Sequence, residues 1–328
     1  MKKLGIAILS ILLVIVIVYQ FFPSFLLSTH GYFLKKQGHF AKETVALNGD
    51  NYYYLDNNRE NKPTVVLLHG YSDRKESWLP FVNKISKDYR IILLDLLGHG
   101  DNNRDFKTSH DFVTQANFVN DVTSELNLDK FDVIGISMGG GVAGQFAANF
   151  KEKTNSLTLI STAGINDYAT PSKMDELMVT KATLEQKKDE FPLLPHKVTK
   201  SSLGDFKQYL FYKNMFIPLR LFKVYLNNTV ENRDFYIKVL EDFLYADVNV
   251  FKNPLNDVLP EIECPINVIW GKQDPLLSSS CVNVITDILD NNLDVTVIDN
   301  CGHATIAEQP KETLIAVTTF LDKIHQKN

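Results

Sequence analysis

The stretch Phe131-Asp-Val-Ile-Gly-Ile-Ser137-Met-Gly-Gly140 decides the fold of this chain. Residues 131–136 form a short, mostly apolar run that is typical of a buried strand, and residues 139–150 then show helical spacing. The junction reads Gly-x-Ser-x-Gly, and a tight turn from strand to helix exposes the serine hydroxyl at the end of the strand. The flanking glycines allow a strained backbone there. We therefore predict Ser137 to be a nucleophile, against the alternative of a structural turn in a Rossmann-like sheet.

Short apolar runs alternate with helical patterns on both sides of this turn. Further strands are expected at 64–68, 90–94, 156–160, 266–270 and 295–298, and further helices at 78–86, 110–126 and 306–324. A hairpin of residues 43–47 and 52–55 with its turn at 48–50 precedes them. Buried strands between helices indicate an α/β fold, with a mostly parallel sheet that is covered by helices on both faces.

Residues 163–262 interrupt this alternation and are called the insertion below. They contain helical stretches at 173–188, 218–226 and 232–244, many aromatic residues and no clear buried strand. The insertion is either a plain helical subdomain with its own small core or a helical cap over a hydrophobic pocket. Its position between two strands favours the cap, because ligand sites in such sheets form at the strand ends.

The N-terminus departs from the pattern of a soluble protein. Residues 4–22 carry no charge and follow Lys2 and Lys3, and a helix of that length spans about 28 Å, close to the thickness of a bilayer core. No Ala-x-Ala cleavage site follows, which favours an uncleaved signal anchor over a cleaved signal peptide. We therefore predict a transmembrane anchor at 1–22, a juxtamembrane connector at 23–40 and a catalytic domain at 41–325.

The flanks of this anchor leave two questions open. Lys2 and Lys3 favour a cytoplasmic N-terminus, but further lysines on the other flank weaken the contrast, so the side of the membrane that the catalytic domain occupies is not decided. The connector also carries apolar residues that either lie among lipid headgroups or pack on the domain. These residues are Phe25, Leu26, Leu27, Tyr32 and Phe33.

The composition excludes several classes of protein. Hydrophobic residues make up 45% and charged residues 22% of the chain, which is ordinary for a globular protein. The formal net charge of −5 provides no basic field for nucleic acid. Cys264, Cys281 and Cys301 are too few and too scattered for a metal cluster or a disulfide framework. We therefore expect no metal, no cofactor, no nucleic acid and no obligate protein partner.

A serine nucleophile needs a base, and the order Ser, acid, His places it late in the chain. His303 lies in the loop that follows the last predicted strand, in Asn300-Cys-Gly-His303. His99 is the competitor, although its Gly-His-Gly context is typical of a turn. His69 precedes Gly70 and is expected to shape a loop. We therefore predict His303 to be the base.

The acid of such a site orients the imidazole and stabilises its protonated form. Asp274 follows the penultimate strand, in Trp270-Gly-Lys-Gln-Asp274, and one helix and one strand separate it from His303. Asp299 is too close in sequence to reach the far nitrogen of that histidine, and Asp95 opens a turn and is expected to be structural. We therefore predict Asp274 to be the acid.

An oxyanion needs two backbone N–H donors. Met138, directly after the nucleophile, is expected to provide one. The other is expected from the loop after the first buried strand, where Tyr71 is the candidate. The bulk of Tyr71 is expected to cost nothing, because only its N–H is used.

Taken together, these motifs resemble those of the α/β-hydrolase family, and within it those of the membrane-anchored monoacylglycerol lipases. The resemblance covers about residues 40–325 and rests on His69-Gly-Tyr-Ser72, Trp78, Asp95-x-x-Gly-x-Gly100, Gly135-Ile-Ser-Met-Gly-Gly140, Trp270-Gly-Lys-Gln-Asp274 and Asn300-Cys-Gly-His303. Phe191-Pro-Leu-Leu-Pro195 and Asn232-Arg-Asp-Phe-Tyr236 also echo the cap of that subgroup. The resemblance implies an α/β-hydrolase fold and a lipid ester as substrate.

The expected activity is therefore that of a membrane-bound serine hydrolase, a lipase that cleaves monoacylglycerols or similar lipid esters through an acyl-enzyme. A general carboxylesterase or a carbon–carbon bond hydrolase would keep the same serine and stays an alternative. Hydrolases of this fold with an aspartate nucleophile are excluded by Ser137. A non-catalytic, membrane-tethered binding protein is the alternative from another class, and the intact set Ser137, Asp274 and His303 argues against it.

Overall fold

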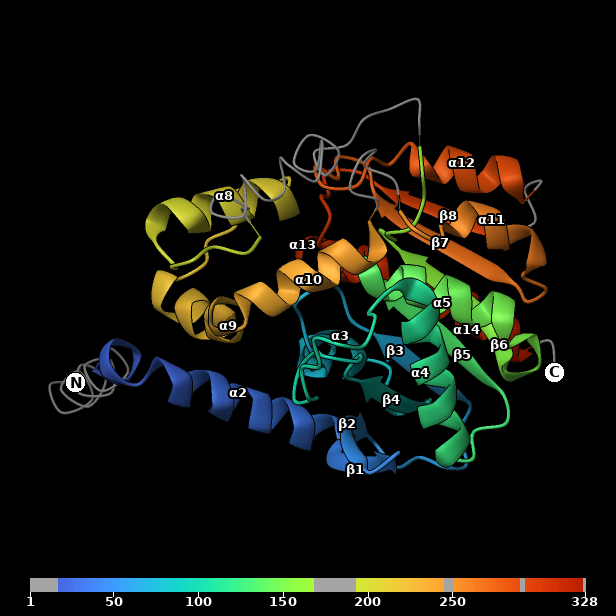
Figure 1. Cartoon of the computed structure of the whole chain (residues 1–328), viewed down its shortest axis with the longest axis horizontal. Coiled ribbons are helices and arrows are strands. Elements are labelled where there is room, and N and C mark those ends of the chain that lie inside the picture. Colours follow the sequence, from blue (N-terminus) through green and yellow to red (C-terminus); the bar gives the residue numbers. More distant parts are fainter. Residues whose placement is uncertain (1–16, 168–192, 245–250, 290–292, 327–328) are drawn as a thin grey trace, which may run out of the picture.

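The computed structural model describes residues 17–167, 193–244, 251–289 and 293–326 (Figure 1). Among these residues, eight strands form one sheet in the order β1-β2-β4-β3-β5-β6-β7-β8. The strands are β1 Ala41–Leu47, β2 Asp50–Asp56, β3 Thr64–Leu68, β4 Arg90–Leu94, β5 Phe131–Ile136, β6 Thr154–Ile160, β7 Ile266–Gly271 and β8 Leu293–Ile298. Neighbouring strands are parallel from β4 to β8, and β2 is antiparallel to both β1 and β4. The predicted mostly parallel sheet is confirmed.

The hairpin β1–β2 forms the edge of the sheet beside β4. Its two-residue turn, Asn48-Gly49, has φ of 53° and 91°. Positive φ at both central residues is the requirement of the type I′ turn that joins twisted antiparallel strands, and Asn-Gly meets it with little strain. The hairpin predicted from this dipeptide is therefore confirmed.

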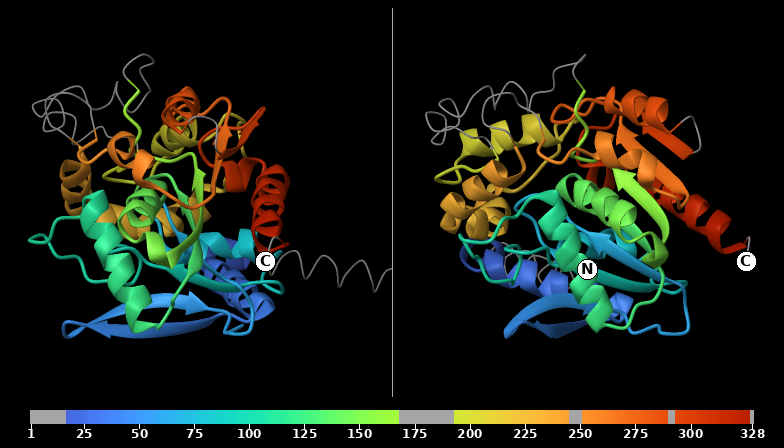
Figure 2. Two further views of the ribbon diagram at one scale, coloured as in Figure 1. Left: turned by 90° about the vertical axis from the view of Figure 1, so that its right-hand side faces the viewer. Right: turned by 45° about the vertical axis from the view of Figure 1, so that its right-hand side comes forward.

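Helices cover both faces of the sheet, as Figure 2 shows for α4 and α5 on one side and α14 on the other. Val66 and Leu68 of β3 pack in the apolar cluster of α4 and α5, whereas Val65 and Leu67 pack in the cluster of α3 and α14. This alternation follows from the two-residue period of a strand. The helices and short 3-10 turns around the sheet are α3 Leu79–Val82, α4 Phe112–Glu125, α5 Met138–Asn149, α11 Leu255–Val258, α12 Cys281–Ile288, α13 Thr305–Glu308, α14 Pro310–Gln326, η1 Lys75–Trp78, η2 Lys151–Lys153 and η3 Leu259–Glu261.

Two predicted helices differ from the observed elements. The helix expected over 78–86 is wrong in extent, because α3 ends before Asn83, whose side-chain amide donates to the backbone carbonyl of Leu34 at 3.0 Å. The helix expected over 306–324 is divided into α13 and α14. Pro310 begins α14, and a proline has no backbone N–H with which to continue the ladder of the preceding helix.

Four described helices lie within the insertion: α8 Lys200–Leu210, α9 Leu219–Glu231, α10 Arg233–Phe243 and the short α11, which packs beside α5. Phe222 and Leu226 of α9 form a small cluster with Val198. Phe235 and Tyr236 of α10 instead belong to the large cluster that covers the sheet, and in Figure 1 α10 runs from α9 back towards the strands. The insertion thus has a small core of its own and is also rooted in the main core. The helix predicted at 173–188 lies outside the described residues.

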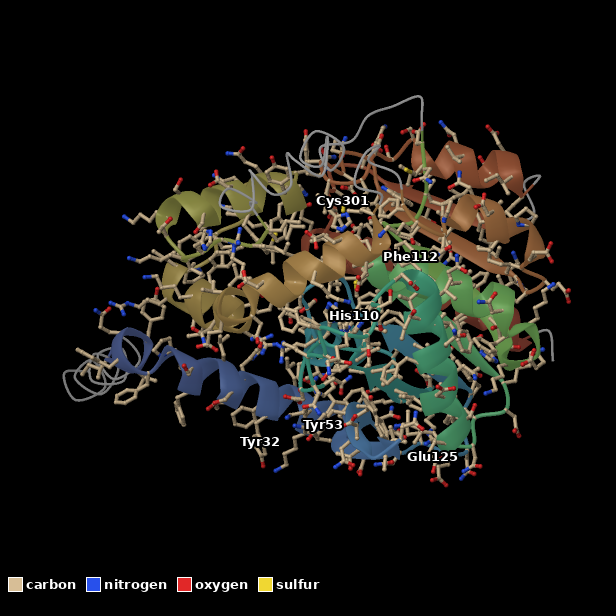
Figure 3. All side chains as sticks on the ribbon, in the orientation of Figure 1. Tyr32, Tyr53, His110, Phe112, Glu125 and Cys301 are labelled. Carbon is tan, nitrogen blue, oxygen red and sulfur yellow. The ribbon has the colours of Figure 1, made fainter. Side chains whose placement is uncertain are left out.

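A helix, α2 Pro23–Gly38, forms most of the predicted connector and lies beside α3 and α9. Pro23 occupies the first helical position, where the missing N–H has no cost. Leu34 packs against the cluster of α3. In contrast, Phe25, Tyr32 and Phe33 are 60%, 57% and 62% exposed, and Figure 3 shows Tyr32 on the side of α2 that faces away from α9. The exposed aromatic side chains and the packed Leu34 therefore lie on different faces of α2, and contact with lipid headgroups stays a prediction.

The predicted transmembrane anchor at 1–22 lies mostly outside the described residues, which begin at residue 17. Within the described part of the chain, no helix has the length and apolar character needed to cross a bilayer.

Candidate active site

Ser137 occupies a sharp turn between β5 and α5. Its φ of 54° and ψ of −122° lie in a sparsely populated region that costs of order 1–3 kcal/mol for a residue with a side chain. Glycines permit the turn: a Cβ on Gly135 would lie 2.1 Å from the carbonyl oxygen of Gly139, and one on Gly139 would lie 2.3 Å from that of Leu68. The local sequence therefore holds the serine in a strained conformation at the carboxyl end of a central strand.

Asp274 and His303 are in direct hydrogen-bond contact. His303 Nδ1 lies 2.8 Å from Asp274 Oδ2, and both side chains are buried. The other carboxylate oxygen, Oδ1, accepts the N–H groups of Leu276 and Leu277 at 2.8 and 2.9 Å. These two bonds fix the carboxylate and leave Oδ2 to orient the imidazole, so that Nδ1 donates and Nε2 is free to accept a proton.

The loops that carry these two residues are tied to each other. Gln273 donates its N–H to the carbonyl of Cys301 at 3.0 Å, and its side-chain oxygen accepts the N–H of Cys301 at 3.1 Å. Ser137 follows β5, whereas these loops follow β7 and β8, and the parallel strands bring all three carboxyl ends to one edge of the sheet.

The loop of residues 69–75, called the Tyr71 loop below, packs against the serine. A Cβ on Gly70 would lie 3.4 Å from Ser137 Cβ and 3.9 Å from Ser137 Oγ. Met138 begins α5, so its N–H is among the donors that a helix leaves without an internal partner in its first turn. The two residues nominated as oxyanion donors thus belong to segments that adjoin Ser137.

The side chain of Tyr71 makes contacts of its own. Its hydroxyl donates to the backbone carbonyl of Tyr236 in α10, and its ring meets those of Tyr236 and Phe243 edge-on, with centroids 5.9 and 6.1 Å apart. Burial raises the pKa of this hydroxyl well above its usual value, which keeps it a donor. The expectation that only the N–H of Tyr71 matters was incomplete, because the side chain joins its loop to the insertion.

A buried ion pair lies at the end of the Tyr71 loop. Lys75 has no exposed surface and its Nζ contacts the carboxylates of Asp95 and Asp101. Burial lowers the pKa of Lys75, but the neighbouring carboxylates, Asp95 foremost, raise it by more. Asp95 also accepts the backbone N–H of Lys75 at 2.8 Å, which agrees with the structural role expected for it.

The competing residues occupy other positions. His69 Nε2 accepts the N–H of Leu96 at 3.1 Å, in keeping with the loop-shaping role expected for it. His99 is buried with its Nδ1 3.0 Å from the carbonyl of Leu97, and burial lowers its pKa well below the usual value. Asp299 pairs with Lys272 at 2.7 Å on the surface.

One contact at this site had no signal in the sequence. Tyr225 of α9 donates its hydroxyl to Asp73 Oδ1 at 2.9 Å, and Arg74 lies over the ring of Tyr225 at 5.5 Å. The partners are 152 positions apart in the chain, and neither stands in a recognisable motif. This contact is a second link between the Tyr71 loop and the insertion.

The described residues contain no group of three or more histidine, cysteine, aspartate or glutamate side chains that could hold a metal ion. Of the three cysteines, Cys281 and Cys301 are buried and Cys264 is partly exposed.

Comparisons with known proteins bear on the family of this chain. The profile of the family described as alpha/beta hydrolase fold matches residues 63–310. Monoacylglycerol lipase ABHD6 of Rattus norvegicus is 30% identical over 271 residues, which cover 81% of this chain and 77% of that protein. Lipase 3 of a Moraxella species is 24% identical over 86% of this chain and 84% of its own length.

Solved structures give the same result. The crystal structure of a membrane phospholipase A, described as a bacterial virulence factor, superposes with a TM-score of 0.82 and 28% identity over 99% of both chains. A 2-hydroxy-6-oxo-6-phenylhexa-2,4-dienoate hydrolase from a Rhodococcus strain, 18% identical with a TM-score of 0.68 over 88% of this chain and 99% of its own, shares the fold. The chain belongs to the α/β-hydrolase family, and it is an ester hydrolase of the lipase type.

Proposed function

We propose that this chain is a membrane-bound serine hydrolase that cleaves monoacylglycerols through Ser137, His303 and Asp274. The observation that carries the proposal is the buried hydrogen bond between His303 and Asp274, formed at the same sheet edge as the strained turn of Ser137. The similarity to monoacylglycerol lipase ABHD6 supports the substrate class.

The acylation half of the reaction follows from the arrangement of these groups. Ser137 Oγ attacks the ester carbonyl while His303 Nε2 takes the hydroxyl proton, and Asp274 stabilises the imidazolium that forms. The negative charge on the carbonyl oxygen is stabilised by the N–H groups of Tyr71 and Met138. The tetrahedral intermediate then collapses, the ester bond breaks, and the leaving glycerol oxygen receives the proton from His303.

Deacylation repeats these steps with water. His303 takes a proton from water, the hydroxide attacks the acyl group on Ser137, and collapse returns the proton to Ser137 Oγ as the fatty acid leaves. Every proton is held by a side chain of this chain, so the mechanism requires no metal or cofactor. Hydrolysis is therefore expected to continue unchanged in an excess of EDTA.

The insertion, residues 163–262, serves in this proposal as the cap that forms the acyl pocket, on a catalytic domain of residues 41–325. Its contacts with the Tyr71 loop, through Tyr236 and Tyr225, support this role, because they hold α9 and α10 against the loop that carries one proposed oxyanion donor. The ring of Phe243, also in α10, contacts the ring of Tyr71.

Membrane attachment is the second part of the proposal, with residues 1–22 as the transmembrane anchor and residues 23–40 as the connector. The exposed aromatic side chains of α2 support it, since a helix with aromatic residues on its solvent face can lie among lipid headgroups. Phe21 and Phe22, directly before α2, are also exposed, at 69% and 59%. The helix would then hold the catalytic domain close to its lipid substrate.

A second substrate class is favoured by one specific finding. The membrane phospholipase A superposes on 99% of this chain with a TM-score of 0.82 and is 28% identical in sequence. The acyl ester of a phospholipid would undergo the same chemistry at Ser137, because the reacting bond is identical. A general carboxylesterase or a carbon–carbon bond hydrolase remains the alternative within the fold, and a catalytically inactive tethered binding protein remains the alternative outside enzymes.

Two measurements on the detergent-extracted full chain test the proposal. A fluorophosphonate probe should label the wild type and fail to label Ser137→Ala, which should lose hydrolysis by several orders of magnitude in kcat while staying folded. Labelling of the variant, or more than about a tenth of its activity remaining, would contradict the nucleophile assignment. A panel of monooleoylglycerol, lysophosphatidylcholine and p-nitrophenyl butyrate then ranks the substrate classes by kcat/KM, and monooleoylglycerol is expected to lead.

A further inference from the structure

Glu308, at the end of α13, lies between the loop that carries His303 and the insertion. Its Oε2 accepts the backbone N–H of Gly302 at 2.6 Å, and the same oxygen accepts that of Tyr212 at 3.1 Å. Its Oε1 accepts the backbone N–H of Lys213 at 2.6 Å. One carboxylate thus joins the residue directly before His303 to the segment that follows α8.

The two segments joined by Glu308 are in close contact. A Cβ on Gly302 would lie 2.6 Å from the backbone nitrogen of Tyr212 and 2.8 Å from Glu308 Oε2. Ala304, directly after His303, donates its N–H to the carbonyl of Leu210 at 3.0 Å. His303 is therefore flanked on one side by a link to the insertion through Glu308 and on the other by a direct bond to Leu210. Hydrogen bonds to a carboxylate are the stronger kind.

This arrangement complements the contacts on the other side of His303. Asp274 fixes the ring, and Gln273 fixes the backbone of Cys301, which Figure 3 labels in this loop. Nothing in those contacts restrains the loop on the side of the insertion. Glu308 supplies that restraint through Gly302, and a displacement of about 1 Å at a catalytic group can lower a rate about a hundredfold.

We infer that Glu308 is a positioning residue, which holds the His303 loop against residues 211–213 of the insertion and so sets the imidazole relative to Ser137. The inference rests on the proposed function, since it assigns a task to the proposed base. It also gives the insertion a part in catalysis that does not depend on contact with the substrate.

Glu308→Gln is the sharpest test. An amide with NH₂ in place of Oε1 loses the bond to Lys213, and one with NH₂ in place of Oε2 loses the bonds to Gly302 and Tyr212. Either orientation therefore removes at least one bond to the insertion and turns an NH₂ group towards a backbone N–H. With p-nitrophenyl butyrate and the detergent-extracted full chain, kcat should fall about tenfold or more while KM stays within about threefold. The rate of fluorophosphonate labelling should fall with kcat, because it depends on the same base.

Two control variants isolate the cause. Glu312→Gln removes an equal charge from an exposed position in the first turn of α14, and Lys213→Ala keeps the backbone N–H that Glu308 binds. Both should retain wild-type kcat. If Glu308→Gln does not yield folded protein, Glu308→Asp takes its place, because the carboxylate then falls one methylene short and the same loss of kcat is expected.

The outcomes separate the two proposals. A wild-type kcat for folded Glu308→Gln, or an equal fall for Glu312→Gln, would overturn the role of Glu308 while Ser137→Ala remained inactive. A rise in KM at unchanged kcat would make Glu308 a part of the pocket and would also overturn the inference. An active Ser137→Ala would instead contradict the proposed function.

Discussion

The segment around the nucleophile and the insertion are held in the molecule by different forces. All residues of α5 from Met138 to Ala148 are buried, and β5 and β6 are buried along nearly their whole length. In contrast, α8 has no buried residue, and α9 buries only Phe222, Leu226 and Thr229. Apolar burial, at about 25 cal/mol per Å², therefore fixes the first region far more firmly than α8 and α9 of the second.

Polar contacts to loops of the catalytic domain add to the apolar packing of α10 in holding the insertion. Four such contacts join residues of the insertion to the catalytic domain: Tyr225 with Asp73, Tyr236 with the hydroxyl of Tyr71, Asp242 with His110 at 3.3 Å, and Tyr212 with the carboxylate of Glu308. Figure 3 labels His110 beside α10. A polar contact of this kind adds about 1 kcal/mol and can be removed singly without loss of the fold. Substitutions that crowd the packed first region should therefore act mainly on folding, and those that remove a polar link of the insertion mainly on catalysis.

The largest effect is expected from Gly139→Ala. Its Cβ would lie 2.3 Å from the carbonyl oxygen of Leu68 and 2.5 Å from that of His69, and a rigid strand end cannot move away from it. We expect a loss of about 3 kcal/mol or more in the free energy of unfolding, or no folded protein. Thermal unfolding followed by circular dichroism checks this, and a Tm within about 2 °C of the wild type would contradict the close packing described here.

The second largest effect is expected from Asp274→Asn, which acts on catalysis without disturbing the packing around Ser137 or the insertion. Asn can keep the oxygen that accepts the N–H groups of Leu276 and Leu277, but it then presents NH₂ to His303 Nδ1. That favours the wrong tautomer and should lower kcat by about 10³–10⁴ with KM nearly unchanged. Asp299→Asn, on the surface pair with Lys272, is the matched control and should be normal. A large rise in KM at normal kcat would make Asp274 a binding residue.

The same contrast explains what the sequence could predict. The strand, turn and helix around Ser137 are dictated by residues adjacent in the chain, since the glycines and the apolar run leave the backbone little choice. The sheet and its order of elements followed from similar local patterns. The limits of the helix at 78–86 were wrong, because its end depends on Asn83 and a carbonyl of α2 that is 49 residues away.

Contacts of the insertion lay beyond such reasoning. Tyr225 and Asp73 are 152 positions apart, and Glu308 and Tyr212 are 96 apart. No periodicity relates them, and exposed polar residues like these look the same whether they face water or a distant loop. Tyr71 illustrates both cases. Its position after Gly70 predicted that its N–H is an oxyanion donor, but only the fold reveals that its hydroxyl bonds to Tyr236.

A smaller effect is expected from Tyr71→Phe, which removes a polar link while keeping the ring contacts. The carbonyl of Tyr236 loses one donor, at a cost of about 1 kcal/mol in stability. Because the loop also carries a proposed oxyanion donor, kcat should fall about threefold to tenfold. Tyr212→Phe, with an exposed ring, is the control. Steady-state kinetics and Tm decide the matter, and a kcat equal to that of the wild type would show that the loop needs no support from α10.

The smallest effect, of opposite sign, is expected from Gly204→Ala in α8. A Cβ at this position would meet no atom within 4 Å, and the residue lies inside a helix that buries no side chain. Alanine in a helix interior is more favourable than glycine by about 1 kcal/mol, so this substitution should raise Tm slightly and leave kcat unchanged. Because it repeats the chemical change of Gly139→Ala, the pair measures directly how the two regions differ. A lower Tm would mean that α8 packs more tightly than its exposure indicates, and a changed kcat would mean that motion of α8 limits turnover.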